Sequence, residues 1–87
     1  MYVHIGGGRL IRATEIIGIF PAAHKSKWYT GIKTKEGRCY ETEDLSENGT
    51  IDSVVLTETK LFLSAISAAT LQKRVNQNLI YNGGNNG

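Results

Sequence analysis

The chain has 87 residues, of which 40% are hydrophobic and 21% charged, and its formal net charge is +2. This length predicts a single domain with a thin core, because a chain of this size buries only roughly 60 to 65% of its unfolded surface, so a partner subunit would help. The composition excludes a disordered chain, and no apolar run approaches the roughly 18 residues of a membrane-spanning helix.

The first part of the chain predicts three short strands. Residues 2–5 and 9–12 are rich in β-forming residues, and the three glycines between them predict a hairpin turn. These glycines lack both the Gly-Lys-Ser/Thr ending of a P-loop and the spacing of a dinucleotide fingerprint, so we do not interpret them as a phosphate site. A third strand is predicted over residues 16–20 and is closed by Pro21, which cannot donate to a sheet ladder.

The middle of the chain predicts a helix, an edge strand and a turn. Residues 22–36 show weak helical spacing, with Trp28 and Ile32 four positions apart, and Gly37 is placed to cap the C-terminal end. Residues 38–42 are expected to form a short edge strand, and the Asn-Gly pair within residues 46–50 predicts a turn.

Charge is segregated along this middle part of the chain. Five cations and Glu36 within residues 24–38 give +4, whereas the six acidic residues within residues 41–58 give −6. Two interpretations stay open: a solvated helix followed by a solvated loop, or two oppositely charged blocks that meet across a contact between subunits.

The last part of the chain predicts a hairpin followed by a helix. Residues 51–56 and 61–65 are two β runs separated by four polar residues, so we expect both strands to face the core. Ser67 stands where a helix N-cap is expected, and Leu71 and Val75 form an apolar stripe. This stripe is expected to pack on the core while the intervening side chains, Gln72, Lys73 and Arg74, face solvent.

Together these elements predict an α+β fold in one domain over residues 1–81. We expect a small mixed, mainly antiparallel β-sheet built from hairpins, with one middle helix and one short C-terminal helix. Residues 82–87 consist only of asparagine and glycine, which predicts a disordered tail.

No catalytic or metal-binding set stands out in the sequence. His4, His24 and Cys39 fall in separate predicted elements without ligand spacing, so no metal site is predicted. No nucleophile is marked out together with a base and an orienting group, so we expect neither an enzyme nor a cofactor or small-molecule substrate. The lone cysteine and the absence of a secretory signal at the N-terminus predict a cytoplasmic protein.

Four segments follow one another in a distinctive order: MYVHIG, LIRATEIIGIF, SVVLT and LSAISAATLQKR. This order resembles the RemA/RemB family of small bacterial regulators of extracellular-matrix genes, and its two ends look closer to the RemB branch. The resemblance spans residues 1 to about 75 and is weak from residue 21 to 45. It implies a DNA-binding transcriptional regulator whose small α/β protomers assemble into a ring, with arginines reaching the DNA.

The resemblance also gives positions for the DNA contacts. The family's adjacent arginine pair falls in the loop before the fifth strand, at Gly49 and Thr50, and a further basic position of the RemA pattern falls on Glu15. The chain therefore departs from the RemA mode of contact at all three positions. Other cations would have to substitute for the missing ones, and the candidates are Arg9, Arg12, Lys25, Lys27, Lys33 and Lys35.

Three functions stay open at this point. The leading hypothesis is a regulator that binds double-stranded DNA as a ring-shaped homo-oligomer, because repetition of a few cations around a ring forms a track that one protomer lacks. The alternative is an oligomeric structural or protein-interaction module that has lost DNA binding. A third reading has Trp28 and Tyr29 stacking on the bases of single strands, although such a pair more often belongs to a core.

Overall fold

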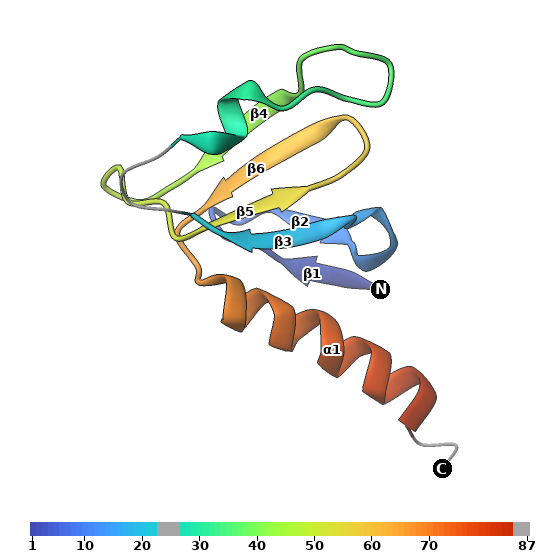
Figure 1. Ribbon diagram of the computed structural model, residues 1–87. Helices are drawn as coiled ribbons and strands as arrows, with labels where there is room; N and C mark the ends of the chain where they lie inside the picture. Colours follow the sequence, from blue (N-terminus) through green and yellow to red (C-terminus); the bar gives the residue numbers. More distant parts are fainter. Residues whose placement is uncertain (23–26, 85–87) are drawn as a thin grey trace.

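The computed structural model describes residues 1–22 and 27–84, with side chains as far as residue 77. The predicted α+β class is confirmed (Figure 1). In chain order the elements are β1 (Tyr2–His4), β2 (Leu10–Arg12), the 3-10 helix η1 (Ala13–Glu15), β3 (Gly18–Pro21), the 3-10 helix η2 (Trp28–Gly31), β4 (Glu41–Leu45), β5 (Ser53–Leu56), β6 (Lys60–Ser64) and α1 (Ala68–Gly84).

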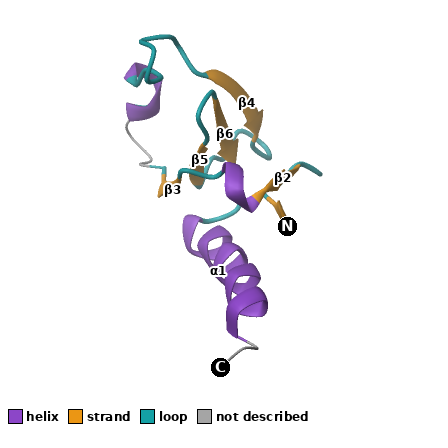
Figure 2. Ribbon diagram, turned by 90° about the vertical axis from the view of Figure 1, so that its right-hand side faces the viewer, coloured by secondary structure: helices purple, strands orange, loops and turns teal. Residues whose placement is uncertain are grey.

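The strands form two sheets. The larger sheet has the order β3-β5-β6-β4, in which β4 runs parallel to β6 and the other pairs are antiparallel. The antiparallel pairing of β5 with β6 agrees with the predicted hairpin, although both strands are shorter than predicted. β1 and β2 pair antiparallel as a separate two-stranded sheet. Figure 2 shows the larger sheet between η2 on one side and the β1–β2 hairpin on the other.

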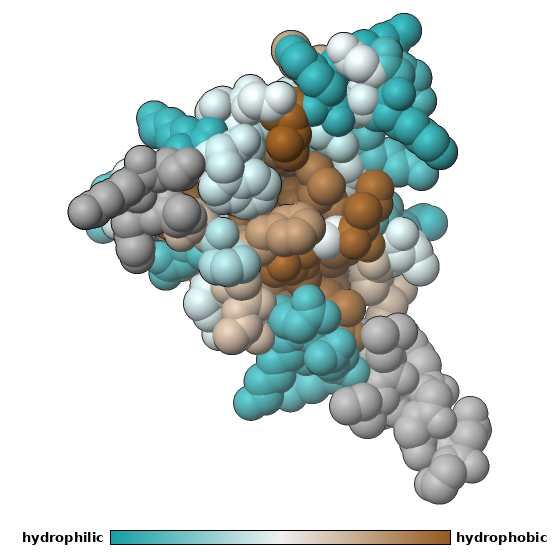
Figure 3. Space-filling view, viewed as in Figure 1, coloured by the Kyte–Doolittle hydropathy of each residue, from teal (hydrophilic) through white to brown (hydrophobic). Residues whose placement is uncertain are grey.

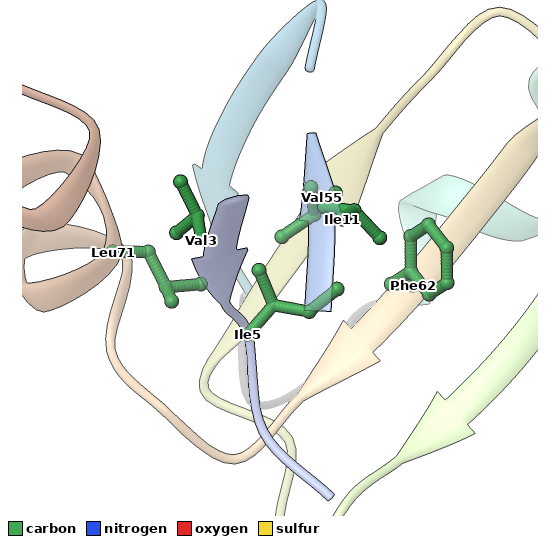
Figure 4. Packing of buried hydrophobic residues seen from close by; sticks show 6 residues of the cluster. All are labelled: Val3, Ile5, Ile11, Val55, Phe62 and Leu71. Carbon is green, nitrogen blue, oxygen red and sulfur yellow. The ribbon is translucent and has the colours of Figure 1, made fainter. Parts of the chain in front are cut away.

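Each face of the larger sheet has its own hydrophobic core, because successive side chains of a strand point to opposite faces. Val55 and Phe62 point toward the β1–β2 hairpin and α1, whereas the neighbouring Val54, Leu61 and Leu63 point toward the segment that contains η2. The buried members of the first core, shown in Figure 4, are Val3, Ile5, Ile11, Val55, Phe62 and Leu71.

The β1–β2 hairpin is fixed to the larger sheet at its glycine turn. Gly6, Gly7 and Gly8 all have positive φ angles, of 110°, 56° and 72°, which glycine adopts without steric cost. Next to this turn, the hydroxyl of the buried Ser64 donates a hydrogen bond of 2.7 Å to the carbonyl oxygen of Ile5. This bond joins the hairpin to β6 directly, in addition to the apolar packing of the first core.

The N-terminal half of α1 confirms the predicted cap and stripe. The Ser67 hydroxyl oxygen accepts a hydrogen bond of 3.1 Å from the backbone N–H of Thr70, while Leu71 is fully buried and Val75 is half-buried on the first core. Arg74 does not simply face solvent as predicted, since its guanidinium donates a 2.7 Å hydrogen bond to the carbonyl oxygen of His4. The helix is also longer than the short helix predicted and includes residues 82–84.

Loss of this cap should measurably destabilise the protein. Replacing Ser67 with alanine leaves the Thr70 N–H without its acceptor, which typically costs about 1 kcal/mol. In a domain of this size, we expect the midpoint of thermal unfolding to fall by about 4 to 8 °C. Ser67→Asp is the control, because a carboxylate caps equally well, and an equal loss in both variants would contradict the capping role.

The helix predicted over residues 22–36 is wrong for the described part of that range. Only the short η2 forms there, followed by an isolated antiparallel bridge between Lys33 and Cys39. The β-branched side chains that follow Tyr29 at every second position favour extended backbone over helix. Gly37 accordingly serves a tight turn with φ 81°, and its N–H donates to the carbonyl oxygen of Thr34.

The edge strand lies later in the chain than predicted. Residues 38–42 were expected to form it, whereas β4 spans Glu41–Leu45 and pairs with β6 in parallel. Part of the acidic block therefore lies in a strand instead of a loop. Charged side chains are common on edge strands because they discourage pairing with further strands.

Candidate nucleic-acid interface

The predicted DNA-contacting cations lie in separate places on the protomer. Arg9 and Arg12 belong to the β1–β2 hairpin, whereas Lys27 precedes η2 on the opposite side of the larger sheet (Figure 2). Lys33 and Lys35 lie on the segment between η2 and β4. Lys25 lies outside the described residues. The structure therefore does not bring the predicted set onto one surface of a single subunit.

Arg9 is engaged by the protein itself. Its Nε lies 3.0 Å from Glu43 Oε2, and its guanidinium carbon lies 5.6 Å from the centre of the Phe62 ring. The N–H is not aimed at the carboxylate, so this contact is an ion pair without an aligned hydrogen bond and the buried Nε keeps no hydrogen-bond partner. Lys60 approaches the same carboxylate at 3.6 Å. Arg9 is therefore a poor candidate for phosphate contact.

Arg12 is exposed on the outer face of the hairpin. Its guanidinium carbon lies 5.9 Å from the centre of the Tyr2 ring. The pKa of Arg12 is raised by a side-chain hydrogen bond with Tyr2 and, secondarily, by charge attraction to Tyr2 and Glu15. Arg12 thus keeps its charge at any physiological pH and is accessible to an anionic partner.

Three cations gather on a turn that we call the basic arm, residues 33–39, which projects beyond β4 at the top of Figure 1. It carries Lys33, Lys35 and Arg38, all exposed. Among the side chains described as far as residue 77, Arg9 pairs with Glu43, and Lys60 pairs with Glu41 and Glu43. No other ion pair forms among these side chains. The three cations of the arm are therefore not neutralised by carboxylates of their own subunit.

Arg38 was counted in the basic block of residues 24–38 but was not among the candidate DNA contacts. The predicted helix ended at Glu36 and left Arg38 beyond its C-terminal cap. In the structure, the Thr34 N–H donates a hydrogen bond of 2.8 Å to the Arg38 carbonyl oxygen, and the Arg38 N–H donates a hydrogen bond of 3.1 Å to the Thr34 hydroxyl. This closed turn sets Arg38 beside the two lysines, and only recognition of the turn would have revealed it.

The loop that the family resemblance associates with arginines lies at the other end of the sheet. Gly49 lines an open depression of about 420 Å³ together with Lys27, Tyr29 and Asp44. Hydrogen bonds from the side chain and backbone of Ser46 lower the pKa of Asp44, so this carboxylate is ionised at neutral pH. Among the described residues, Lys27 is thus a cation that lies beside the Gly49–Thr50 loop.

Other site types find no support in the described residues. No group of three or more His, Cys, Asp or Glu side chains is placed to hold a metal ion in residues 1–22 and 27–84. Across the same ranges, none of the helices has the length and apolarity needed to cross a lipid bilayer.

A comparison with protein families shows the family to which this chain belongs. The family model described as RemA-like, Extracellular matrix regulatory protein A-like, matches residues 2–75. The chain belongs to the RemA-like family. The match confirms the resemblance seen in the sequence, and the RemA-like family is not known as a family of enzymes. No curated protein sequence matches the chain.

Within this RemA-like fold, the positions that depart from the RemA pattern lie far apart in one subunit. Glu15 lines an open depression of about 350 Å³ with Glu58, at the end of the sheet where β5 turns into β6. Gly49 and Thr50 precede β5 and lie at its opposite end.

Proposed function

We propose that this RemA-like protein is a cytoplasmic DNA-binding transcriptional regulator of extracellular-matrix genes, and that its domain of residues 1–81 acts in a ring-shaped homo-oligomer. Membership in the family supports the regulatory role. The observation that carries DNA binding is the basic arm, whose three cations project from the sheet without an internal carboxylate partner among the described side chains. Such side chains are available to phosphate oxygens.

A single arm is too weakly charged to hold DNA on its own. Its three cations and Glu36 leave a net charge of +2 over residues 33–39. Affinity grows with the number of phosphates that are neutralised, so identical arms repeated around a ring would convert this small charge into a continuous basic track. Arg12 adds an exposed cation to each subunit.

The salt dependence of duplex binding tests this function. We expect the logarithm of the association constant to fall linearly with the logarithm of salt concentration, with a slope of about 0.9 for each phosphate contacted. Replacing Lys33, Lys35 and Arg38 together with glutamine should reduce that slope by up to about 2.7 for each subunit engaged, measured by gel shift or fluorescence anisotropy.

Arg9→Gln is the matched control for the arm variant. It also removes one cation, but Arg9 already faces Glu43 at 3.0 Å, so the slope should stay nearly unchanged. A wild-type protein whose binding does not respond to salt, or that shifts no duplex at low salt, would contradict the proposal.

The second candidate function is an oligomeric interaction module without DNA binding. The observations that favour it are the missing arginines at Gly49 and Thr50, and the acidic side chains of β4. Native mass spectrometry with and without a short duplex separates the two functions. An oligomer that takes up no duplex supports the module, an oligomer–duplex complex supports the regulator, and a monomer in dilute solution contradicts both.

A further inference from the structure

We infer that a second surface, distinct from the basic arm, binds unpaired nucleobases of single-stranded nucleic acid. We call it the aromatic row, and it consists of Phe20, Trp28 and Tyr29. The row is continuous with the depression beside the Gly49–Thr50 loop, because Tyr29 belongs to both. The inference goes beyond duplex binding by the arm, which requires only contacts to phosphates.

The three rings of the row contact one another edge to face. The ring centres of Phe20 and Trp28 lie 5.8 Å apart with an interplanar angle of 84°, and those of Trp28 and Tyr29 lie 5.8 Å apart at 82°. Tyr29 is half-buried and packs against the second core, so it anchors the row to the sheet. The rings are therefore held in place by one another before any ligand arrives.

Two of these rings are accessible to solvent. Phe20 is 41% exposed and Trp28 36% exposed, on the sheet face that carries η2. Gly18 makes room for the Phe20 ring, since a Cβ atom at Gly18 would lie only 2.6 Å from Phe20 Cζ. Figure 3 shows hydrophobic residues gathered over the middle of this face, between hydrophilic regions above and below. Solvent-accessible aromatic rings supply the surfaces on which bases stack in single-strand binding proteins.

Polar groups beside the row match the rest of a nucleotide. Lys27 is exposed and lines the same depression as Tyr29, where its ammonium is available to a backbone phosphate. Asp44 lies in the same depression, and its ionised carboxylate can accept a hydrogen bond from an N–H on the Watson–Crick edge of an unpaired base, such as N3–H of thymine. The depression holds about 420 Å³, within the range of sites that take small ligands.

This combination favours single strands over duplexes and over a protein partner. In a duplex the faces of the bases are covered by their neighbours, so exposed rings gain nothing from stacking. A purely apolar contact with a protein would not call for a cation and an ionised carboxylate beside the rings. Burial of the row by a second copy of the chain is the competing explanation, and the experiment below separates it.

Trp28 is the only tryptophan of the chain, so its fluorescence reports directly on the row. We expect an oligothymidine of about 12 nucleotides to quench this emission and to bind more tightly than a duplex of equal charge. Phe20→Leu keeps the reporter and should weaken binding at least about fivefold, and Lys27→Gln should reduce the salt slope by about 0.7. Tyr2→Leu removes an exposed ring on the opposite side of the sheet, so it should change neither the affinity for oligothymidine nor the salt slope.

The basic-arm variant makes failure of this inference distinguishable from failure of the proposed function. It should keep the quenching by oligothymidine while losing affinity for duplex. Emission that does not change at saturating oligothymidine would overturn the inference. So would emission that changes only with protein concentration, since that result would show that a second copy of the chain covers the row.

Discussion

Replacing Phe62 with alanine is expected to destabilise the protein by about 3 to 5 kcal/mol, because the substitution leaves a cavity in the first core. The Phe62 side chain is 2% exposed and lies between the larger sheet and the β1–β2 hairpin (Figure 4). Small domains have total stabilities of only about 5 to 15 kcal/mol, so much of the fold's stability is lost. Denaturant unfolding followed by circular dichroism measures the change.

Phe20→Ala is the matched control for this prediction. The two substitutions remove the same atoms, but Phe20 is 41% exposed and lies on an edge strand. It should therefore cost well under half as much as Phe62→Ala, since less apolar surface returns to water. Equal losses for the two variants would show that the first core does not organise the fold as described.

Short-range patterns were sufficient to predict the two ends of the chain. The turn at residues 6–8 has positive φ angles, which favour the three glycines found there. The Ser67 cap and the Leu71–Val75 stripe follow from the spacing of residues in a helix. Each of these signals lies within a few residues of the element that it specifies. No distant part of the chain was needed to interpret them.

The middle of the chain could not be predicted in the same way. β4 forms because it pairs in parallel with β6. The segment of chain that separates these two strands contains the whole of β5. The segment before β4 is extended because Ile32 and Tyr40 pack against the second core. Long-range packing of this kind overrides weak helical spacing, and the short-range pattern contains no sign of it.

The candidate site depends even more on long-range placement. The sequence treated Arg9 and Arg12 as equivalent cations, yet one faces Glu43 at 3.0 Å and the other is exposed. Alternation along β2 explains the difference, because Arg9 points toward the sheet with Ile11 while Arg12 points outward. Such a distinction requires the docking of the hairpin on β6 and β4, which no local pattern specifies.

That docking depends on Ser64, which is fully buried and joins residues far apart in the chain. Its hydroxyl donates a hydrogen bond of 2.7 Å to the Ile5 carbonyl oxygen and accepts a hydrogen bond of 3.0 Å from the Ile66 N–H. Ser64→Ala leaves both backbone groups without this partner, and each such buried group costs about 1 to 3 kcal/mol. We expect a clear fall in the unfolding midpoint and faster hydrogen exchange at Val3 and Ile11, which belong to the hairpin.

Ser53→Ala provides the comparison that isolates this effect. Ser53 is equally buried, but within the described part of the chain its hydroxyl makes one hydrogen bond, of 2.7 Å to the Ile66 carbonyl oxygen, and none to the hairpin. Its loss should therefore cost less and should leave hydrogen exchange in β1 and β2 close to that of the parent protein. If Ser53→Ala were the more damaging change, the hairpin would be held mainly by apolar packing and by its contacts to Glu43 and Arg74. The orientation of Arg9 and Arg12 would then not depend on the bond from Ser64, and the basic surface of the hairpin would persist without it.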